Sequence, residues 1–456
     1  MSATTRVQLS EKRIFEQLPV PQAVATLAIP TIISQLISMA YSMADTWLIG
    51  QTGDGKQVAA VTLAYPVFMM LTAISNLFGI GGCSYISRLL GQNERERAKH
   101  VAAFSVWGAV TSTLVLSVAV GLFMDPLIKL LSADESSSVY VRQYIFWTVV
   151  IGGIPTMLNL LLAHLIRAIG EAKKASIGIS LGGVANLILD PIFIFGLKMD
   201  VEGAAIATCL ANVLATLYFL YYFYRLRNIS VLTMNPAKVR LSRNIVIPVF
   251  AIGLPAAVSL FMSILSNSVL NRLMSVYSSQ AIAAVGIVKK ADMIPTHITN
   301  GLSSGILTLL AYNSTSGNYT RLKKVMRFSF VMAVSFTLIC LVAYQLFAPQ
   351  ILRLFINESQ TVAYGTVFMR LHCLAMPLMA ATSIFTAFFQ AVGCAREAAT
   401  LSVLRKGVTD IPLMFVLNIM LPMYGLLLAQ PIMDVISLSV AVTLYVHYKR
   451  RRPQFC

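Results

Sequence analysis

The sequence predicts an all-α integral membrane protein with twelve transmembrane helices in two six-helix lobes. Of its 456 residues, 57% are hydrophobic and 12% are charged, whereas charged residues make up roughly 25% of a soluble globular domain. Apolar stretches of about 20 residues, the length that crosses a bilayer as a helix, recur along the chain. Landmarks of the first half return in the same order in the second half. Together these features predict a polytopic membrane protein built from a repeat.

Twelve apolar stretches define the predicted spans, and the short polar segments between them are the predicted loops. Each stretch is long enough for a helix to cross the hydrocarbon core. In chain order the spans are 23–50, 57–87, 101–124, 143–166, 175–197, 203–224, 245–270, 281–312, 328–347, 371–391, 398–420 and 425–447.

The basic residues alternate between rich and poor loops, which predicts the orientation. The N-terminal tail, the C-terminal tail and every second loop hold 26 of the 35 Lys and Arg residues, and the opposite loops hold 7. The other two, Lys289 and Lys290, lie inside the eighth span. By the positive-inside rule both termini are cytoplasmic, as an even number of spans requires. The net charge of +17 is therefore a topology signal, and we expect no nucleic-acid partner.

An internal repeat relates the two halves. Pro30 in AIP corresponds to Pro255 in GLP, an offset of 225 residues. Later landmarks keep nearly the same offset: Asn93 with Asn318, Pro155 with Pro377, and Gly203 with Gly425. Because each half contains six spans, the halves have the same orientation, and a pseudo-two-fold axis along the membrane normal should relate them. We predict an N-terminal lobe at 1–225, a basic cytoplasmic linker at 226–244 and a C-terminal lobe at 245–456.

Two lobes with parallel repeats favour a transporter, in which substrate sits between lobes that rock to expose it to either side. A channel, a scramblase or a purely structural repeat are alternatives. The sequence has no GxxxxGK[ST] phosphate loop and no HExxH motif, and its five His residues are scattered singly. We therefore expect neither an ATP-driven pump nor an enzyme, and no cofactor or metal site.

Asp190 is the only charge in the run IGISLGGVANLILDPIFIFGL, and an ionisable group inside a span is a functional hypothesis by default. Asn186 lies four residues earlier, on the same helix face. Pro191 follows and leaves the carbonyl of Leu187 without its helical partner. Three polar groups are thus expected at one depth.

Asp45 lies late in the first span, so it falls in the outer half of the membrane, at the depth of Asp190. The sixth span adds Thr208 and Asn212, which share a helix face. We predict that Asp45, Asn186, Asp190 and Thr208 line one polar cavity in the first lobe. Two carboxylates, an amide and a hydroxyl suit reversible binding of a proton or of Na⁺. As alternatives, Asp45 is a helix-end carboxylate wetted by headgroups, and Thr208 bonds its own helix backbone.

The second lobe contains weaker candidates. Asp292 is expected to pair with Lys289 at a spacing of three residues, which is a structural role for a buried charge. Asp410 and Asp434 are second-rank candidates for sensing a cation or contacting substrate, because no neighbouring polar cluster is evident for either.

Several motifs resemble the multidrug and toxic compound extrusion (MATE) family over nearly the whole chain, with the bacterial DinF-like and staphylococcal-type branch most similar. They are AIPTIISQLISMAYSMADTWLIG, FGIGGCSYISRLLGQ, RAIGEAK, ANLILDPIFIFGL and VEGAAIAT, in that order. The resemblance implies a monomeric transporter in the lipid of the bacterial cytoplasmic membrane. It implies export of organic, often cationic, compounds and amphipathic drugs in exchange for H⁺ or Na⁺.

Carried over by position, the family's cation site falls on Asp45, Asn186, Asp190 and Thr208, with Tyr144 as a further member. Other branches bind Na⁺ with a Glu in the seventh span and an Asp in the tenth, and these spans contain no acid here, which favours protons. Pro30 and Pro191 are expected to allow helix bending.

The alternative function is that of a lipid-linked precursor flippase. A flippase needs a basic cavity, and Lys289 and Lys290 are the only residues expected to provide it. A non-transporting sensor is a third alternative.

Overall fold

A computed structural model of the protein describes residues 11–52, 55–131, 135–226 and 230–452. Within these ranges the chain forms helices and no strand. The first half contains η1 (Arg13–Gln17), α2 (Val20–Gly50), α3 (Gly55–Gly91), α4 (Arg95–Leu122), α5 (Met124–Leu130), α6 (Glu135–Ile145), η2 (Phe146–Ile151), α7 (Gly153–Ala168), α8 (Ala172–Pro191), η3 (Ile192–Gly196) and α9 (Asp200–Leu226). The second contains η4 (Pro236–Lys238), α10 (Arg243–Met274), α11 (Ser279–Thr315), α12 (Tyr319–Arg353), α13 (Ser359–His372), η5 (Cys373–Ala375), α14 (Met376–Val392), α15 (Ala395–Val403), η6 (Leu404–Val408), α16 (Asp410–Met420) and α17 (Tyr424–Arg451).

All twelve predicted spans fall on helical segments of the described chain. By length and composition nine segments qualify as membrane spans. A tenth is the pair Ser137–Ile151 and Gly153–Ala168, which is bent by 52°. The predicted eighth and eleventh spans are not among these ten.

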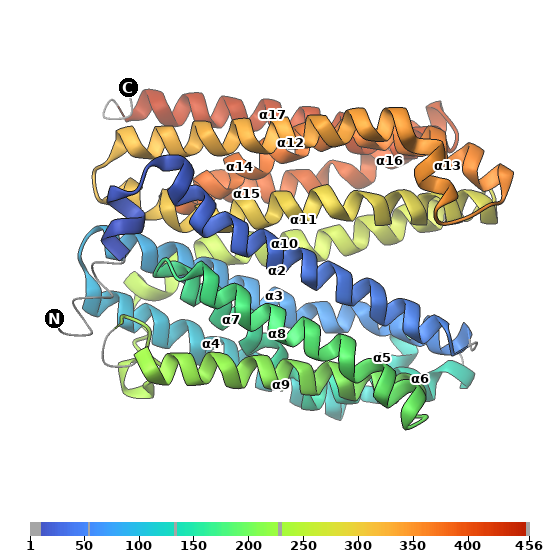
Figure 1. Cartoon of the computed structure of the whole chain (residues 1–456), viewed down its shortest axis with the longest axis horizontal. Coiled ribbons are helices and arrows are strands. Elements are labelled where there is room, and N and C mark those ends of the chain that lie inside the picture. The colour runs from blue at the N-terminus through green and yellow to red at the C-terminus, as the bar shows by residue number, and fades with distance from the viewer. Residues whose placement is uncertain (1–10, 53–54, 132–134, 227–229, 453–456) are drawn as a thin grey trace.

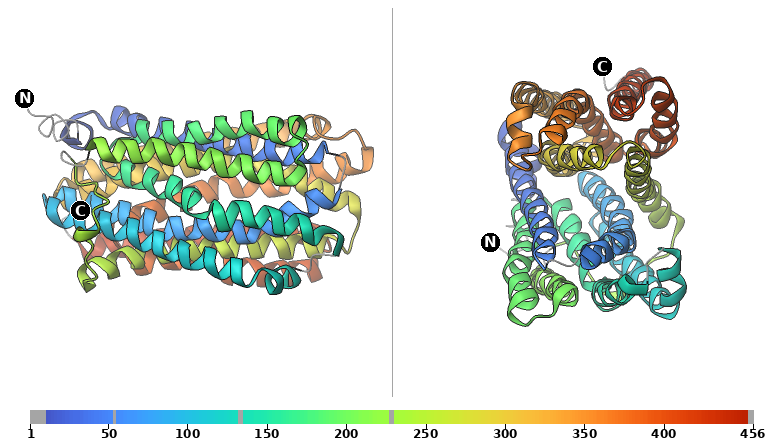
Figure 2. Two further views of the ribbon diagram at one scale, coloured as in Figure 1. Left: turned by 90° about the horizontal axis from the view of Figure 1, so that it is seen from below. Right: turned by 90° about the vertical axis from the view of Figure 1, so that its right-hand side faces the viewer.

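The helices of the two halves form two groups. In the end-on view of Figure 2 the helices from α2 to α9 (blue to green) lie below those from α10 to α17 (yellow to red), and α2, α3, α10 and α11 lie where the groups meet. The start of α2 and the end of α17 are at the same end of the bundle (left in Figure 1). We call this the terminal end, and the opposite end the far end. This is the expected two-lobed architecture.

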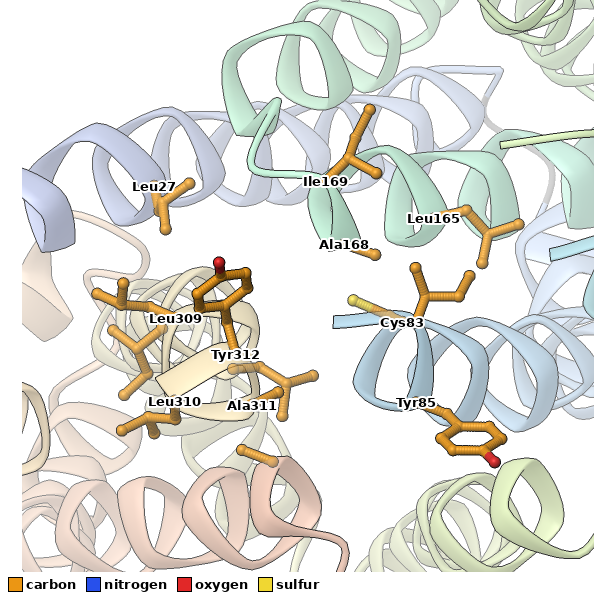
Figure 3. Packing of buried hydrophobic residues seen from close by; sticks show 14 of the residues in the cluster. Leu27, Cys83, Tyr85, Leu165, Ala168, Ile169, Leu309, Leu310, Ala311 and Tyr312 are labelled. Carbon is orange, nitrogen blue, oxygen red and sulfur yellow. The ribbon is translucent and has the colours of Figure 1, made fainter. Parts of the chain in front are cut away.

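The buried core is shared between the halves at the terminal end and divided at the far end. One cluster of buried apolar residues contains side chains of both halves, including Leu27 of α2, Cys83 of α3, Leu165 of α7 and Tyr312 of α11 (Figure 3). Two further clusters near the far end each belong to one half, around Ile145 in the first half and in the second around α11, α13 and α17. Among the described residues, the apolar core that the two halves share therefore lies at the terminal end.

Close backbone contacts fix where α3 crosses α10. A Cβ added at Gly81 of α3 would collide with the backbone carbonyl of Val249, and one added at Gly253 of α10 would collide with the backbone carbonyl of Leu77. Because glycine has no side chain, the two helices approach each other backbone to backbone.

A second crossing joins α2 and α11 in the same way. An added Cβ would lie 2.7 Å from the Cα of Ile32 at Gly301, and 2.7 Å from the Cα of Ala28 at Gly305. The two glycines are one helical turn apart, the spacing that lets helices pack closely in membranes. Both crossings join the first half to the second.

The segment before α2 joins the halves at the terminal end. Glu11 forms an ion pair with Arg95 at the start of α4. Glu16 accepts a hydrogen bond of 2.6 Å from the hydroxyl of Tyr312 in α11, and the ring of Phe15 stacks on Tyr312 with centroids 4.7 Å apart. This segment therefore forms contacts with residues of both halves.

Candidate functional site

The structure brings together the four residues predicted to form a cation site. The side-chain nitrogen of Asn186 donates to Asp190 Oδ1 at 2.9 Å and to Thr208 Oγ1 of α9 at 3.3 Å. Asp190 is 0% exposed and Asn186 is 2% exposed. Asp45 approaches from α2, close enough for its charge to act on Asp190. The four residues come from three helices.

Three oxygens of this group are buried without a hydrogen-bond partner among the described residues. They are Asp45 Oδ1, Asp190 Oδ2 and Asn186 Oδ1. An unsatisfied buried polar atom is costly, and most such atoms in proteins have a partner. Oxygen acceptors fit a proton, which would turn a carboxylate into a donor, or a small hard cation.

Two tyrosines lie beside this group of four residues. Tyr144 of α6 is 7% exposed, and it lies within electrostatic reach of Asp45 and Asp190. Tyr41 of α2 is also within reach of both, and it passes close to α8 because an added Cβ at Gly183 would lie 2.9 Å from its ring. Tyr41 was not predicted, although it lies one helical turn before Asp45 on the same face, which was an available signal.

Two further asparagines extend the hydrogen bonds of this group beyond Thr208. Asn212 donates to the backbone carbonyl of Thr208 at 2.9 Å, and Asn159 of α7 donates to Asn212 Oδ1 at 2.9 Å. Asn212 is a predicted secondary candidate. Asn159 was not predicted, although Thr156 lies three residues earlier on the same helix face, which was an available signal.

The two prolines lie in different settings. α2 continues as one helix from Val20 to Gly50 through Pro30. Pro191 is the last residue of α8, and the π-helical turn η3 follows it directly. The change of winding therefore begins at the residue that cannot donate a helical hydrogen bond.

Asp434 is part of a polar cluster in the second half, so the expectation of an isolated residue is wrong. Asp434 is 0% exposed. Its Oδ1 lies 3.1 Å from Arg405 Nε, and its Oδ2 accepts from Gln430 at 3.0 Å. Lys406 donates to Gln430 at 3.2 Å. Arg405 belongs to a helix distant in the sequence, so spacing could not reveal the pair.

Asp410, which the sequence places close to Arg405 and Lys406 but in no polar cluster, also has a hydrogen-bond partner on another helix. It is 0% exposed, and its Oδ2 accepts a hydrogen bond from the hydroxyl of Ser266 in α10. The charge of Lys406 is within its reach, while Asp410 Oδ1 has no hydrogen-bond partner among the described residues.

The predicted pair of Asp292 with Lys289 is wrong. Asp292 Oδ2 lies 3.5 Å from Nε2 of His372, at the end of α13, and 3.4 Å from the hydroxyl of Thr296. Helix α13 packs against α11 and brings the imidazole to the carboxylate. Lys289 lines a cavity, although its charge still acts on Asp292.

This cavity has a volume of about 820 Å³ and lies between the halves. Tyr65 of α3 lines it and is also within electrostatic reach of Tyr41 and Tyr144, whereas Asp45, Asn186, Asp190 and Thr208 are not among the lining residues. The wall from the first half includes Gln35, Tyr65, Asn76 and His164, and that from the second half includes Lys289, Lys290, Asp292, Met293, His372, Met376, Met379, Arg405, Lys406, Gln430 and Asp434.

The positions of Arg405 and Lys406 correct two expectations. Both were counted among the basic loops although they fall within the predicted span 398–420, and they lie in the cavity wall, on η6 between two helices. Lys289 and Lys290 are therefore not the only basic residues at membrane depth.

The described ranges contain no group of three His, Cys, Asp or Glu side chains arranged as metal ligands would be.

Comparisons with known proteins agree with this architecture. The family model described as MatE matches residues 30–192 and again residues 255–416. The two matches are offset by 225 residues at their starts (255 − 30) and by 224 at their ends (416 − 192). The predicted repeat is thus found by an independent comparison.

Relatives match over the whole chain. The multidrug export protein MepA of Staphylococcus saprophyticus is 30% identical over 439 residues, which is 96% of each chain. A crystal structure of a mutant of the Vibrio cholerae MATE transporter VcmN has a TM-score of 0.88 at 19% identity and covers 99% of both chains. The outward-facing structure of a multidrug resistance MATE transporter has a TM-score of 0.87 at 22% identity, covering 99% of this chain and 100% of that one.

Proposed function

Because the chain belongs to the MatE family of multidrug transporters, we propose that it exports organic compounds in exchange for cation entry. The observation that carries the proposal is that three buried oxygens, on Asp45, Asn186 and Asp190, have no hydrogen-bond partner within the described parts of the chain. The cavity of about 820 Å³ is lined by Tyr65, which is within electrostatic reach of Tyr41 and Tyr144 beside these residues, and it is large enough for a drug-sized molecule, since ligand pockets measure roughly 300–1,000 Å³. Transport itself needs no enzymatic step and no cofactor.

In this proposal Asp190 and Asp45 bind the coupling ion. Asn186 orients Asp190 through its hydrogen bond of 2.9 Å, and Thr208 accepts from the same amide. Tyr144 closes the site on the side of α6. When an ion neutralises one carboxylate, the repulsion between the two carboxylates falls and α2 can pack more closely on α8.

We propose H⁺ as the coupling ion, with Na⁺ as the alternative. A single proton satisfies a carboxylate oxygen and lets it donate to its neighbour. Na⁺ needs several oxygen ligands at once, and the two carboxylates, the amide oxygen and Thr208 are the available set. The absence of acids from the seventh and tenth predicted spans favours the proton.

The proposed topology has both termini on the cytoplasmic side of a bacterial inner membrane, because the basic loops lie at the terminal end. The division into lobes at 1–225 and 245–456, joined by the linker 226–244, follows the repeat. With the halves joined at the terminal end and divided at the far end, the conformation is open to the outside. Pro30 and Pro191 are the proposed bending points, and we propose a monomer surrounded by lipid.

The proposed substrates are small organic molecules, with organic cations and amphipathic drugs as the class that the family resemblance gives. Asp292 and Asp434 are acids in the cavity wall, and a cationic drug that binds either one would have to displace a side chain that already contacts it. One observation favours the second candidate, a flippase of lipid-linked precursors: four basic residues line the cavity, where a phosphate headgroup would need them. The full-length match to MepA favours the drug exporter.

Flux through proteoliposomes with independently set proton and sodium gradients tests the proposal. Vesicles loaded with rhodamine 123 or ethidium should exchange the dye against an imposed proton gradient, at a rate that an equal sodium gradient does not match. Exchange driven by sodium alone would assign Na⁺. Flux that ignores both gradients would overturn the antiporter, and movement of a fluorescent lipid without dye flux would favour the flippase.

A further inference from the structure

The charges in the wall of the central cavity are predominantly positive. Among the described residues, four Lys and Arg side chains line it, Lys289, Lys290, Arg405 and Lys406, against the two acids Asp292 and Asp434. All six come from the second half of the chain. The first half contributes neutral polar and aromatic groups to the wall, such as Gln35 and Tyr65.

The two acids already have partners. Asp434 is held by Arg405 at 3.1 Å and by Gln430 at 3.0 Å. Asp292 lies 3.5 Å from His372 and 3.4 Å from Thr296. Neither carboxylate is free to take a cationic group from a ligand without losing one of these contacts.

The lysines are compensated less well. Lys406 donates to the neutral amide of Gln430 at 3.2 Å, and it is within electrostatic reach of Asp410, Asp434 and Asp292 but forms no ion pair with them among the described residues. The charges of Lys289 and Lys406 also act on each other across the wall. Like charges that face one cavity repel, and an anionic group between them would relieve the repulsion.

We propose that the second-half wall of the cavity is a binding site for the anionic group of an amphipathic substrate, held by Lys289 and Lys406. The apolar part of the substrate would lie against Met293, Met376 and Met379, which line the same cavity and whose flexible thioethers adapt to differently shaped ligands. The class is therefore an organic carboxylate, sulfonate or phosphate with an apolar body. The substrate range extends beyond organic cations.

This inference rests on the proposed function and names a substrate class for the same cavity. Fluorescein and rhodamine 123 test it, because they share a xanthene core but carry opposite charges near pH 8. Binding to the purified chain in phosphatidylcholine nanodiscs is measured by fluorescence anisotropy. This lipid has no net charge, so no anionic headgroup competes for the lysines.

The wild-type protein should bind fluorescein, and the double variant Lys289→Gln/Lys406→Gln should bind it roughly tenfold to hundredfold more weakly, the scale of lost charged hydrogen bonds. Rhodamine 123 should bind the double variant at least as well as the wild type, which also shows that the variant is folded. Lys129→Gln on the exposed helix α5, outside the cavity, is the matched control and should leave both affinities unchanged.

Three results would overturn the inference: no fluorescein binding to the wild type, equal fluorescein affinity in the double variant, or an equal loss in the control. Gradient-driven flux of rhodamine 123 in the same preparation keeps the two proposals apart. If rhodamine 123 is exported and fluorescein is not bound, the anion site is wrong and the antiporter stands.

Discussion

The side-chain nitrogen of Asn186 lies 2.9 Å from Oδ1 of Asp190, one helical turn further along α8. The bond fixes the carboxylate and satisfies one oxygen, while the other oxygen has no hydrogen-bond partner among the described residues. A carboxylate that is held on one side and unsatisfied on the other is prepared to take a proton or a cation. The predictions below begin from this arrangement.

Asp190→Asn should reduce gradient-driven dye efflux from proteoliposomes on the order of tenfold or more. The amide cannot bind the coupling ion, so only uncoupled leak remains. Asp125→Asn is the control, because Asp125 is exposed at the edge of the bundle and pairs there with Arg142. It should transport at the wild-type rate. Undiminished efflux in the Asp190 variant would remove this residue from the mechanism.

Arg405→Gln should destabilise the protein by about 3 kcal/mol, the scale for breaking a buried ion pair and leaving its partner charged. The reason is that the carboxyl group of Asp434, with a side chain that is 0% exposed, loses its ion-pair partner Arg405. The double variant Arg405→Gln/Asp434→Asn should recover most of the loss. Thermal unfolding in detergent measures both, with Arg396→Gln at an exposed position as the control. A double variant no more stable than the single one would contradict the argument.

The sequence predicted the group in the first half because local rules apply there. Asn186 and Asp190 are one turn apart on one helix, and depth along successive spans placed Asp45 and Thr208 beside them. The cluster in the second half was not predictable in this way. Its contacts join Ser266 to Asp410 across 144 residues and Arg405 to Asp434 across 29, and only the packing of helices brings such residues together.

The error at Asp292 has a similar cause. A spacing of three residues allowed a pair with Lys289, but a lysine stem is long and flexible and can instead reach a water-filled space. His372 arrives from another helix and lies 3.5 Å from the carboxylate. Helical spacing indicates which residues share a face, but not which of several partners is chosen.

Gly305→Ala should impair both stability and transport, because its added Cβ would lie 2.7 Å from the Cα of Ala28. Backbone atoms cannot turn aside as a side chain can, so α2 and α11 must separate, at a cost of about 1–3 kcal/mol. Gly50→Ala introduces the same group where no atom lies within 4 Å. Thermal unfolding and dye efflux should distinguish the two variants. Equal behaviour would mean that the crossing is not tight.

The contacts of the segment before α2 should weaken as the pH rises. Burial raises the pKa of Glu11 above 4.5, with Arg95 opposing and Glu171 adding to the shift. The docked segment therefore holds this proton more tightly than the released one. Its stabilising effect is complete below pH 4.5 and is lost as the pH rises through the raised pKa.

Hydrogen exchange of the backbone amides in 13–17, followed as a function of pH, tests this effect. Protection should fall with rising pH in the wild type and should change less in Glu11→Gln, which cannot ionise. Lys12→Gln, at an exposed neighbouring position, should keep the wild-type profile. A pH profile that is the same in the Glu11 variant would assign the effect to another group.

A rotation of α2 and α11 about their glycine crossing moves the two ends of these helices by unequal distances. Gly305 is 10 residues from the end of α11 at Thr315 and 26 from its start at Ser279, so at 1.5 Å per residue the arms measure about 15 Å and about 39 Å. Ala28 divides α2 in nearly the same ratio, 8 residues from Val20 and 22 from Gly50. A given rotation therefore moves the far end about 2.6 times as much as the terminal end. A drug-sized gap at the far end needs only a small repacking among the side chains at the terminal end, whereas an equal gap at the terminal end would demand a far larger swing. We expect bending at Pro30, two residues beyond the crossing on the long arm of α2, to reduce the rotation that is needed.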